Sequence, residues 1–260
     1  MTIVTSQLTF GDGAVLGSVL GHVFVITLNR PEAMNAINAG ISNGLHEAVE
    51  HLDAESGLHV GVLTGAGRGF CAGMDLKAFS RGENIGPFME FVRHGARKPL
   101  VAAVEGFALA GGLEMALSCD LIVAAKGAKL GIPEAKVGLF AAGGGVMRLP
   151  SRVGFSKAME MAMTGDPILA EEGVELGFVS RVAEVGGALE AALELATSIA
   201  KNAPLAVAAS KQLVRASMGL TEEEFLTLQA PLQASVFTSN DAREGPKAFA
   251  EKRPPEWTGS

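Results

Sequence analysis

A glycine pair followed closely by a glutamate, Gly111-Gly112 and Glu114, is the first pattern in the sequence that can do chemistry. An apolar run ends at this pair, and a helical pattern begins near Leu113. Unpaired N–H groups at a helix N-terminus attract negative charge, and glycine lets a ligand approach the backbone closely. The pattern suits stabilisation of an oxyanion, with Glu114 about one turn further on. The alternative interpretation is that the glycines only let a helix pack closely on a strand.

Two further segments offer groups for the same kind of site. Met74 follows Ala72-Gly73 in a turn after a strand-like run, so its backbone amide is a second candidate donor. Glu134 follows Pro133 in a mostly apolar stretch, where poor solvation raises the pKa of a carboxyl and suits it to acid–base chemistry. A solvated turn glutamate is the competing interpretation, and spacing alone favours it. A run of three glycines, Gly143 to Gly145, lies a little further along the chain.

Other catalytic patterns are missing from the sequence. The five histidines are scattered, and none pairs with a nucleophile at a recognisable spacing. There is no Gly-x-Ser-x-Gly elbow and no phosphate-binding P-loop. Cys71 lies beside the Met74 turn with no base in evidence, which favours a small buried thiol. Cys71 and Cys119 form neither a metal-ligand spacing nor a disulfide framework, so we expect no metal.

The composition limits the partners and the cellular compartment that we expect. The 260 residues carry a net charge of −7, which argues against nucleic acid as a partner because phosphate binding needs a basic face. The chain has no apolar run of membrane-spanning length and begins with no secretory signal pattern, so we expect no membrane association. Two cysteines without a partner pattern fit a reducing compartment. The sequence therefore predicts a cytoplasmic protein.

The elements that must position these groups alternate between strand and helix. Short β-branched runs alternate with helical spacing, which predicts βαβ units and a largely parallel α/β sheet. The predicted strands cover 23–28, 60–63, 100–104 and 121–125, with a helix over 36–52. From about residue 186 only helical patterns occur, and Thr221 to Glu224 form a capping box that opens one helix. We expect helices over 188–201, 205–218 and 241–253.

Three stretches taken together resemble the signature blocks of the crotonase superfamily, and in particular the enoyl-CoA hydratase/isomerase family. They read FCAGMDLK, EGFALAGGLEMALSCD, and KLGIPEAKVGL continuing to GGG, in the family's order and at its spacing. The beginning NRPEAMNAI and the end AREGPKAFAEKR also match. The resemblance therefore covers essentially the whole chain.

The resemblance implies a fold and a site. The fold would be a ββα spiral catalytic core over residues 1–190 and a C-terminal helical trimerisation region over 191–260, in a homotrimer or a dimer of trimers. Glu114 and Glu134 match the two catalytic glutamates of the hydratases, and the amides of Met74 and Gly111 match the oxyanion hole. The stretch Met74, Asp75, Leu76 and Lys77, with Gly111 and Lys252, matches the residues that bind the substrate and its CoA.

Hydration of a 2-enoyl-CoA thioester, or the reverse dehydration, is the activity that the resemblance implies. Relatives with other reactions often keep only one glutamate, so the presence of both favours a hydratase. No cofactor is implied, because coenzyme A is part of the substrate. Isomerisation of a 3-enoyl-CoA and a catalytically silent acyl-CoA-binding subunit stay open as alternatives.

Two positions depart from the family pattern. Ala141-Ala142 stand where relatives often have a proline-containing turn, and Glu32 stands where many carry a basic residue that helps with the CoA phosphates. Phosphate contacts would then rest on Arg30, Lys77, Lys252 or a neighbouring subunit. The identity and length of the acyl chain do not follow from the sequence.

Overall fold

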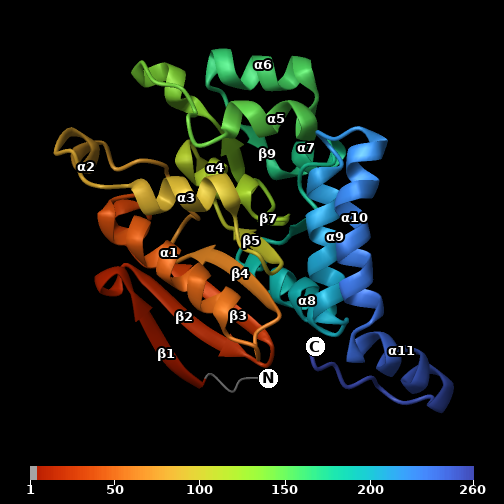
Figure 1. Cartoon of the computed structure of the whole chain (residues 1–260). Helices are drawn as coiled ribbons and strands as arrows, with labels where there is room; N and C mark the ends of the chain where they lie inside the picture. The colour runs from red at the N-terminus through yellow and green to blue at the C-terminus, as the bar shows by residue number, and fades with distance from the viewer. Residues whose placement is uncertain (1–4) are drawn as a thin grey trace.

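A seven-stranded sheet forms the centre of the computed structural model, which describes residues 5–260 (Figure 1). Its first three strands pair antiparallel, and the rest pair parallel. The predicted parallel sheet is therefore confirmed from β3 onward, with an antiparallel hairpin added at its edge. In spatial order the strands are β1 (Thr5–Phe10), β2 (Val15–Leu20), β3 (Val23–Leu28), β4 (Val60–Gly65), β5 (Leu100–Val104), β7 (Leu121–Ala125) and β10 (Arg181–Ala183).

A second, smaller sheet carries the segments that matter for the site. Its strand β6 (Phe107–Leu109) pairs parallel with β8 (Lys129–Gly131), which pairs antiparallel with β9 (Ile168–Leu169). Isolated bridges also join Cys71 to Ala108 and Ile37 to Met74. The small sheet therefore gathers segments that lie far apart in the sequence.

Apolar side chains bury both faces of the large sheet, as expected for parallel strands covered on each side. On one face pack α1 (Ala39–Ala54), α3 (Gly86–His94) and α4 (Gly111–Ser118). On the other face lies α8 (Ala188–Ala200), whose alanines at four-residue spacing contact valines of the strands. Because α8 crosses residue 190 and packs on the sheet, it joins the core to the predicted helical region. The domain boundary itself stays a prediction.

The remaining helices of the body surround the small sheet. The α-helices are α2 (Leu76–Ser80), α5 (Gly145–Val153), α6 (Phe155–Thr164) and α7 (Ala170–Glu175). Three short 3-10 helices cover Gly11–Gly13 (η1), Pro31–Ala33 (η2) and Pro133–Val137 (η3). Figure 1 places α5 and α6 at the upper end of the molecule, above α4.

Three C-terminal helices form an arm beside the body: α9 (Pro204–Ala216), α10 (Glu222–Phe237) and α11 (Asn240–Glu251) (Figure 1). In this single chain no residue of α9 or α10 is fully buried. Lys211 and Arg215 tie α9 to the body through ion pairs with Asp120 at 2.8 and 2.9 Å. The predicted capping box is confirmed, because the Thr221 hydroxyl accepts from the Glu224 amide and the Glu224 carboxylate accepts from the Thr221 amide.

None of the helices within residues 5–260 combines the length and the apolar character needed to cross a membrane.

Candidate active site

The turn that carries Met74 lies directly against the N-terminus of α4. Gly73 has φ +100°, and a methyl group added there would lie 2.6 Å from the Cβ of Ala110 and 3.4 Å from the amide nitrogen of Gly111. The Ile37 amide donates to the Gly73 carbonyl at 2.8 Å, and the Ile37 carbonyl accepts from the Asp75 amide at 3.0 Å. Ile37 therefore fixes the backbone on both sides of Met74.

The two candidate oxyanion donors are both available. Within residues 5–260 neither the Met74 amide nor the Gly111 amide has a hydrogen-bond acceptor. Gly111 opens α4, where the first N–H groups have no partner inside the helix. Two unpaired amides on adjoining segments can stabilise a negative oxygen placed between them.

At Ala110, the residue before α4, the backbone adopts an unusual conformation. Its φ of 52° and ψ of −129° lie outside the regions that L-residues normally adopt. The Ala110 amide donates to the Gly131 carbonyl at 2.9 Å, and its own carbonyl accepts from Glu114 at 3.1 Å. The strain is held in place by β8 on one side and by the first turn of α4 on the other.

Gly112 explains the other half of the glycine pair. A methyl group at this position would lie 2.3 Å from the Cys71 carbonyl oxygen. Gly112 therefore permits the close helix–strand packing that was the alternative interpretation of the pair, while Gly111 leaves its amide free. The packing interpretation is confirmed at Gly112, and the oxyanion role of Gly111 stays a prediction.

The Glu114 carboxyl is buried, with 4% of the residue exposed. Its Oε1 accepts from the Gly145 amide at 2.9 Å, and a methyl group at Gly143 would lie 2.6 Å from its Oε2. Burial raises the pKa of Glu114, while the amides of Gly145 and Gly143 and the charge of Arg148 oppose this rise. The glycine run selected in the sequence is therefore the cradle of this carboxylate, a role that the sequence analysis did not assign.

Glu134 lies near Glu114, in the 3-10 helix η3. Burial first, and then the negative charge of Glu114, raises the pKa of Glu134 to about 7. Its Oε2 is buried and has no hydrogen-bond partner among residues 5–260. An unsatisfied buried carboxyl oxygen is costly unless it is protonated or meets a ligand. Glu134 can therefore hold a proton near neutral pH beside the negative charge of Glu114.

Asp75 has a structural task at the beginning of α2. Its Oδ1 accepts from the amides of Lys77 and Ala78, both at 3.1 Å, and its Oδ2 accepts from Arg30 at 3.2 Å. The Ala78 amide, followed by Arg30, lowers the pKa of Asp75. Arg30 also donates to the Ala36 carbonyl at 2.6 Å, so its guanidinium is engaged by protein groups. Leu76, at 52% exposure, and Lys77 stay open to solvent.

Lys252 lies apart from the other predicted site residues. It ends α11 with φ 54°, and Figure 1 shows α11 at the opposite end of the molecule from α2. One chain therefore does not bring Lys252 to Met74 or Glu114. The predicted contact with CoA would require a neighbouring subunit, and it stays a prediction.

The predicted buried thiol is confirmed for Cys71. The side chain is fully buried, its Sγ donates to the Asn35 carbonyl at 3.2 Å, and burial raises its pKa to about 12. A neutral thiol of this kind is a poor nucleophile.

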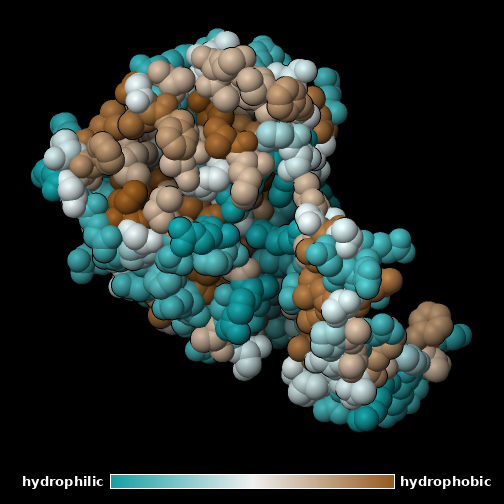
Figure 2. All heavy atoms as spheres, turned by 45° about the horizontal axis from the view of Figure 1, so that its top comes forward, coloured by the Kyte–Doolittle hydropathy of each residue, from teal (hydrophilic) through white to brown (hydrophobic). Residues whose placement is uncertain are grey.

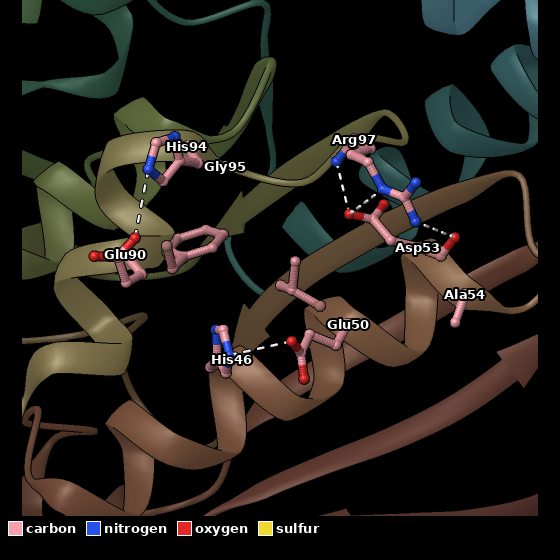
Figure 3. A pocket seen from close by; sticks show the side chains of 10 residues that line it. His46, Glu50, Asp53, Ala54, Glu90, His94, Gly95 and Arg97 are labelled. Atoms are coloured by element: carbon pink, nitrogen blue, oxygen red, sulfur yellow. Dashed lines mark hydrogen bonds and ion pairs between the residues drawn. The ribbon is translucent and has the colours of Figure 1, made fainter.

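A cavity of about 540 Å³ lies between α1 and α3, and none of the predicted site residues lines it (Figure 3). Basic and acidic side chains face one another around it: His46 and Glu50, His94 and Glu90, and Arg97 and Asp53. No group of His, Cys, Asp and Glu side chains in the described part of the chain is arranged to hold a metal ion.

Comparison with known proteins agrees with this architecture. The structure of enoyl-CoA hydratase EchA1 from Mycobacterium marinum superimposes with a TM-score of 0.91 at 52% identity, over 95% of this chain and 99% of the other. Enoyl-CoA hydratase EchA19 from Mycobacterium tuberculosis is 40% identical over 91% of this chain and 93% of its own length. A carnitinyl-CoA dehydratase from Proteus mirabilis is 42% identical over 92% of this chain and 96% of its own length.

The fold and these neighbours define a crotonase-fold protein, as predicted. The sequence model for the enoyl-CoA hydratase/isomerase family matches residues 20–260. The chain therefore belongs to the enoyl-CoA hydratase/isomerase family.

Proposed function

We propose that the protein is an enoyl-CoA hydratase, which adds water to the double bond of a 2-enoyl-CoA thioester or removes it in the reverse direction. The observation that carries this proposal is a pair of nearby carboxyls: Glu114 is buried, and Glu134 is half-buried with its pKa raised by burial and by the charge of Glu114. The free amides of Met74 and Gly111 support it further, because the reaction passes through an enolate whose oxygen needs hydrogen-bond donors.

Each group has one task in the proposed reaction. The thioester oxygen accepts hydrogen bonds from Met74 and Gly111, which draws electrons from the conjugated double bond. The ionised Glu114 takes a proton from water as the water oxygen attacks Cβ, and the electron pair of the double bond moves to the thioester oxygen. Protonated Glu134 then gives its proton to Cα, which restores the carbonyl.

The proton count balances within the pair. Hydration begins with Glu134 protonated and ends with Glu114 protonated, so the pair carries one proton before and after the step. The same charge state therefore serves hydration and dehydration. The proposed reaction uses no metal or redox cofactor, since both the acid and the base come from the chain.

Dehydration of a β-hydroxyacyl-CoA is the direction suggested by the similarity to the Proteus mirabilis carnitinyl-CoA dehydratase. Isomerisation of a 3-enoyl-CoA would need only one well-placed base, so the second carboxyl favours addition or removal of water. A silent acyl-CoA-binding subunit would have no need of either carboxyl.

Assembly into a homotrimer or a dimer of trimers is also a proposal. Figure 2 turns the α5–α6 end toward the viewer and shows apolar side chains gathered there. Exposed residues at this end include Phe140, Met147, Phe155 and Met163, each about 70% exposed. The arm also exposes Val214, Phe237 and Phe249. Large exposed apolar patches typically mark an interface. Light scattering after size-exclusion chromatography would give the subunit number, and a monomer would contradict the proposal.

The predicted cytoplasmic location stays a prediction.

Loss of the conjugated enoyl-thioester absorbance tests the activity. Crotonyl-CoA and a longer 2-enoyl-CoA are offered to the wild type, Glu114→Gln and Glu134→Gln, and the product is identified as the β-hydroxyacyl-CoA by mass spectrometry. Rapid loss in the wild type and its collapse in both variants is the expected result. Conversion of a 3-enoyl-CoA without hydration of any 2-enoyl-CoA would replace the proposal by the isomerase.

A further inference from the structure

Arg148 connects the Glu114 cradle to a neighbouring helix. Its Nη1 donates to the Gly143 carbonyl at 3.1 Å, and its Nη2 donates to the Val92 carbonyl in the last turn of α3. The side chain is half-buried, and the guanidinium lies close over Gly144, where an added methyl group would be 2.3 Å from Nη1. Arg148 therefore contacts the same glycine turn whose Gly145 amide donates to Glu114.

The glycine turn that Arg148 contacts is also the turn that contacts the Glu114 carboxylate. The Gly145 amide donates to Glu114 Oε1 at 2.9 Å, and the Gly143 amide beside it also lowers the pKa of Glu114. Three consecutive glycines have no side chains to fix their conformation, so the turn needs an external anchor to keep its amides aimed. The guanidinium supplies that anchor, because its rigid fork bonds two carbonyls at once.

A second link joins the same network to α4. The Val92 carbonyl also accepts from the Ser118 hydroxyl at 3.2 Å, and that hydroxyl lies 2.8 Å from the Glu114 carbonyl. Arg148 and Ser118 thus meet at one acceptor. These hydrogen bonds connect the glycine turn, the helix α4 that carries Glu114, and the end of α3.

We infer that Arg148 is a positioning residue, whose two hydrogen bonds hold the Gly143–Gly145 turn so that its amides face the Glu114 carboxylate. The inference rests on the proposed function, in which Glu114 activates water. The charge of Arg148 acts in the same sense as the amides: it lowers the pKa of Glu114 against the effect of burial. Besides Glu114, the charges that act on Arg148 are those of Arg215 and Arg152, and both lower its pKa.

Arg152 provides a matched control on the same helix. It lies one turn further along α5 and is also half-buried. The charges that act on it are those of Arg215 and Asp120, rather than Glu114. Arg152→Gln removes a comparable guanidinium without touching the glycine turn.

The experiment compares Arg148→Gln, Arg148→Lys and Arg152→Gln. We measure kcat and KM for crotonyl-CoA from pH 5 to 9, the Kd of unreactive butyryl-CoA, and folding by circular dichroism. Arg148→Gln is expected to lower kcat about 100-fold with little change in Kd, and to raise the acidic limb of the pH profile by about one unit. Arg148→Lys keeps the positive charge but cannot make both hydrogen bonds of the guanidinium. Its acidic limb should therefore lie close to that of the wild type, while its kcat stays reduced. Arg152→Gln should match the wild type.

Wild-type kcat and an unmoved limb in Arg148→Gln would overturn the inference, as would an equal loss in Arg152→Gln. If Arg148→Gln does not fold, Arg148→Lys carries the same test. Failure of the proposed function shows separately, as a wild type that hydrates no 2-enoyl-CoA. In that case the carboxyl titration of Glu114, followed by ¹³C NMR and assigned with Glu114→Gln, still decides the inference: an unshifted titration in Arg148→Gln contradicts it.

Discussion

The two halves of the site are built in opposite ways. The oxyanion half consists of backbone, with Met74 and Gly111 offering amides that neighbouring atoms crowd into place. The carboxylate half consists of two side chains in unequal surroundings: Glu114 is cradled by glycine amides, whereas Glu134 keeps one oxygen without a partner among the described residues.

This difference predicts that substitutions will impair the two halves in different ways. A side chain can be neutralised without moving the backbone, so the carboxylate half can lose its chemistry and keep its shape. The oxyanion half has no side chain to remove, and it changes only when added atoms displace the main chain. The following predictions test this contrast.

Glu114→Gln should give the largest loss. The amide keeps the size of the carboxyl but cannot take a proton from water, so we expect kcat to fall by about 10³-fold while the Kd for a saturated acyl-CoA stays near the wild-type value. Steady-state kinetics and isothermal titration calorimetry would measure both. If binding weakened as much as the rate fell, the substitution would have changed the structure of the carboxylate half as well as its chemistry.

Gly112→Ala should damage the oxyanion half through packing. The new methyl group would lie 2.3 Å from the Cys71 carbonyl, so α4 must shift and carry the Gly111 amide with it. We expect a loss of about 10²-fold in kcat/KM together with about 1–3 kcal/mol in the free energy of unfolding. Gly57→Ala is the control, because an added methyl group there meets nothing within 4 Å. Full activity in Gly112→Ala would contradict the crowding argument.

The pH profile should depend on the carboxylate half alone. The pKa of Glu134 is raised to about 7, and the proposed active pair holds one proton, so kcat/KM should fall as pH rises through about 7. The decline should approach about tenfold per pH unit, in hydration and in dehydration alike. Rates measured in both directions in the same buffers would check this. A high-pH limb that survives in Glu134→Gln would assign it to another group.

Ala110→Gly should have the smallest effect and the opposite sign on stability. Glycine adopts φ 52° and ψ −129° readily, so relief of strain should outweigh the greater freedom of the unfolded chain by about 1 kcal/mol. Chemical denaturation would measure the gain, and kinetics would show whether a looser Gly111 amide slows turnover a few-fold. A loss of stability would mean that Ala110 is not strained in solution.

Local patterns predicted the backbone geometry of the candidate oxyanion half well. The glycine pair and the helical spacing after it indicated free amides at Gly111, and the capping box at Thr221 appeared as expected. Both signals lie within a few neighbouring residues. The conformations that they specify follow from short-range geometry, which a single sequence contains.

The carboxylate half depends on long-range pairing. Glu114 and Glu134 come together because β6 pairs with β8, and spacing alone favoured a solvated Glu134. The cradle and Arg148 were missed for the same reason, since a glycine turn does not state what it binds and an arginine in an amphipathic helix looks like a surface residue. Their partner atoms are backbone carbonyls and amides that leave no mark in the residue types. The family resemblance, rather than periodicity, supplied the pairing of the two glutamates.

The burial of both thiols gives the protein an internal reporter of unfolding. Cys71 and Cys119 are the chain's only cysteines, and burial raises the pKa of each. Thiol reagents attack the thiolate, so neither sulfur should react until the structure around it opens. The rate of labelling at Cys71 would therefore time the opening of the oxyanion loop, and that at Cys119 the opening behind α4. Both clocks run without substrate, so they can follow variants that have lost all turnover.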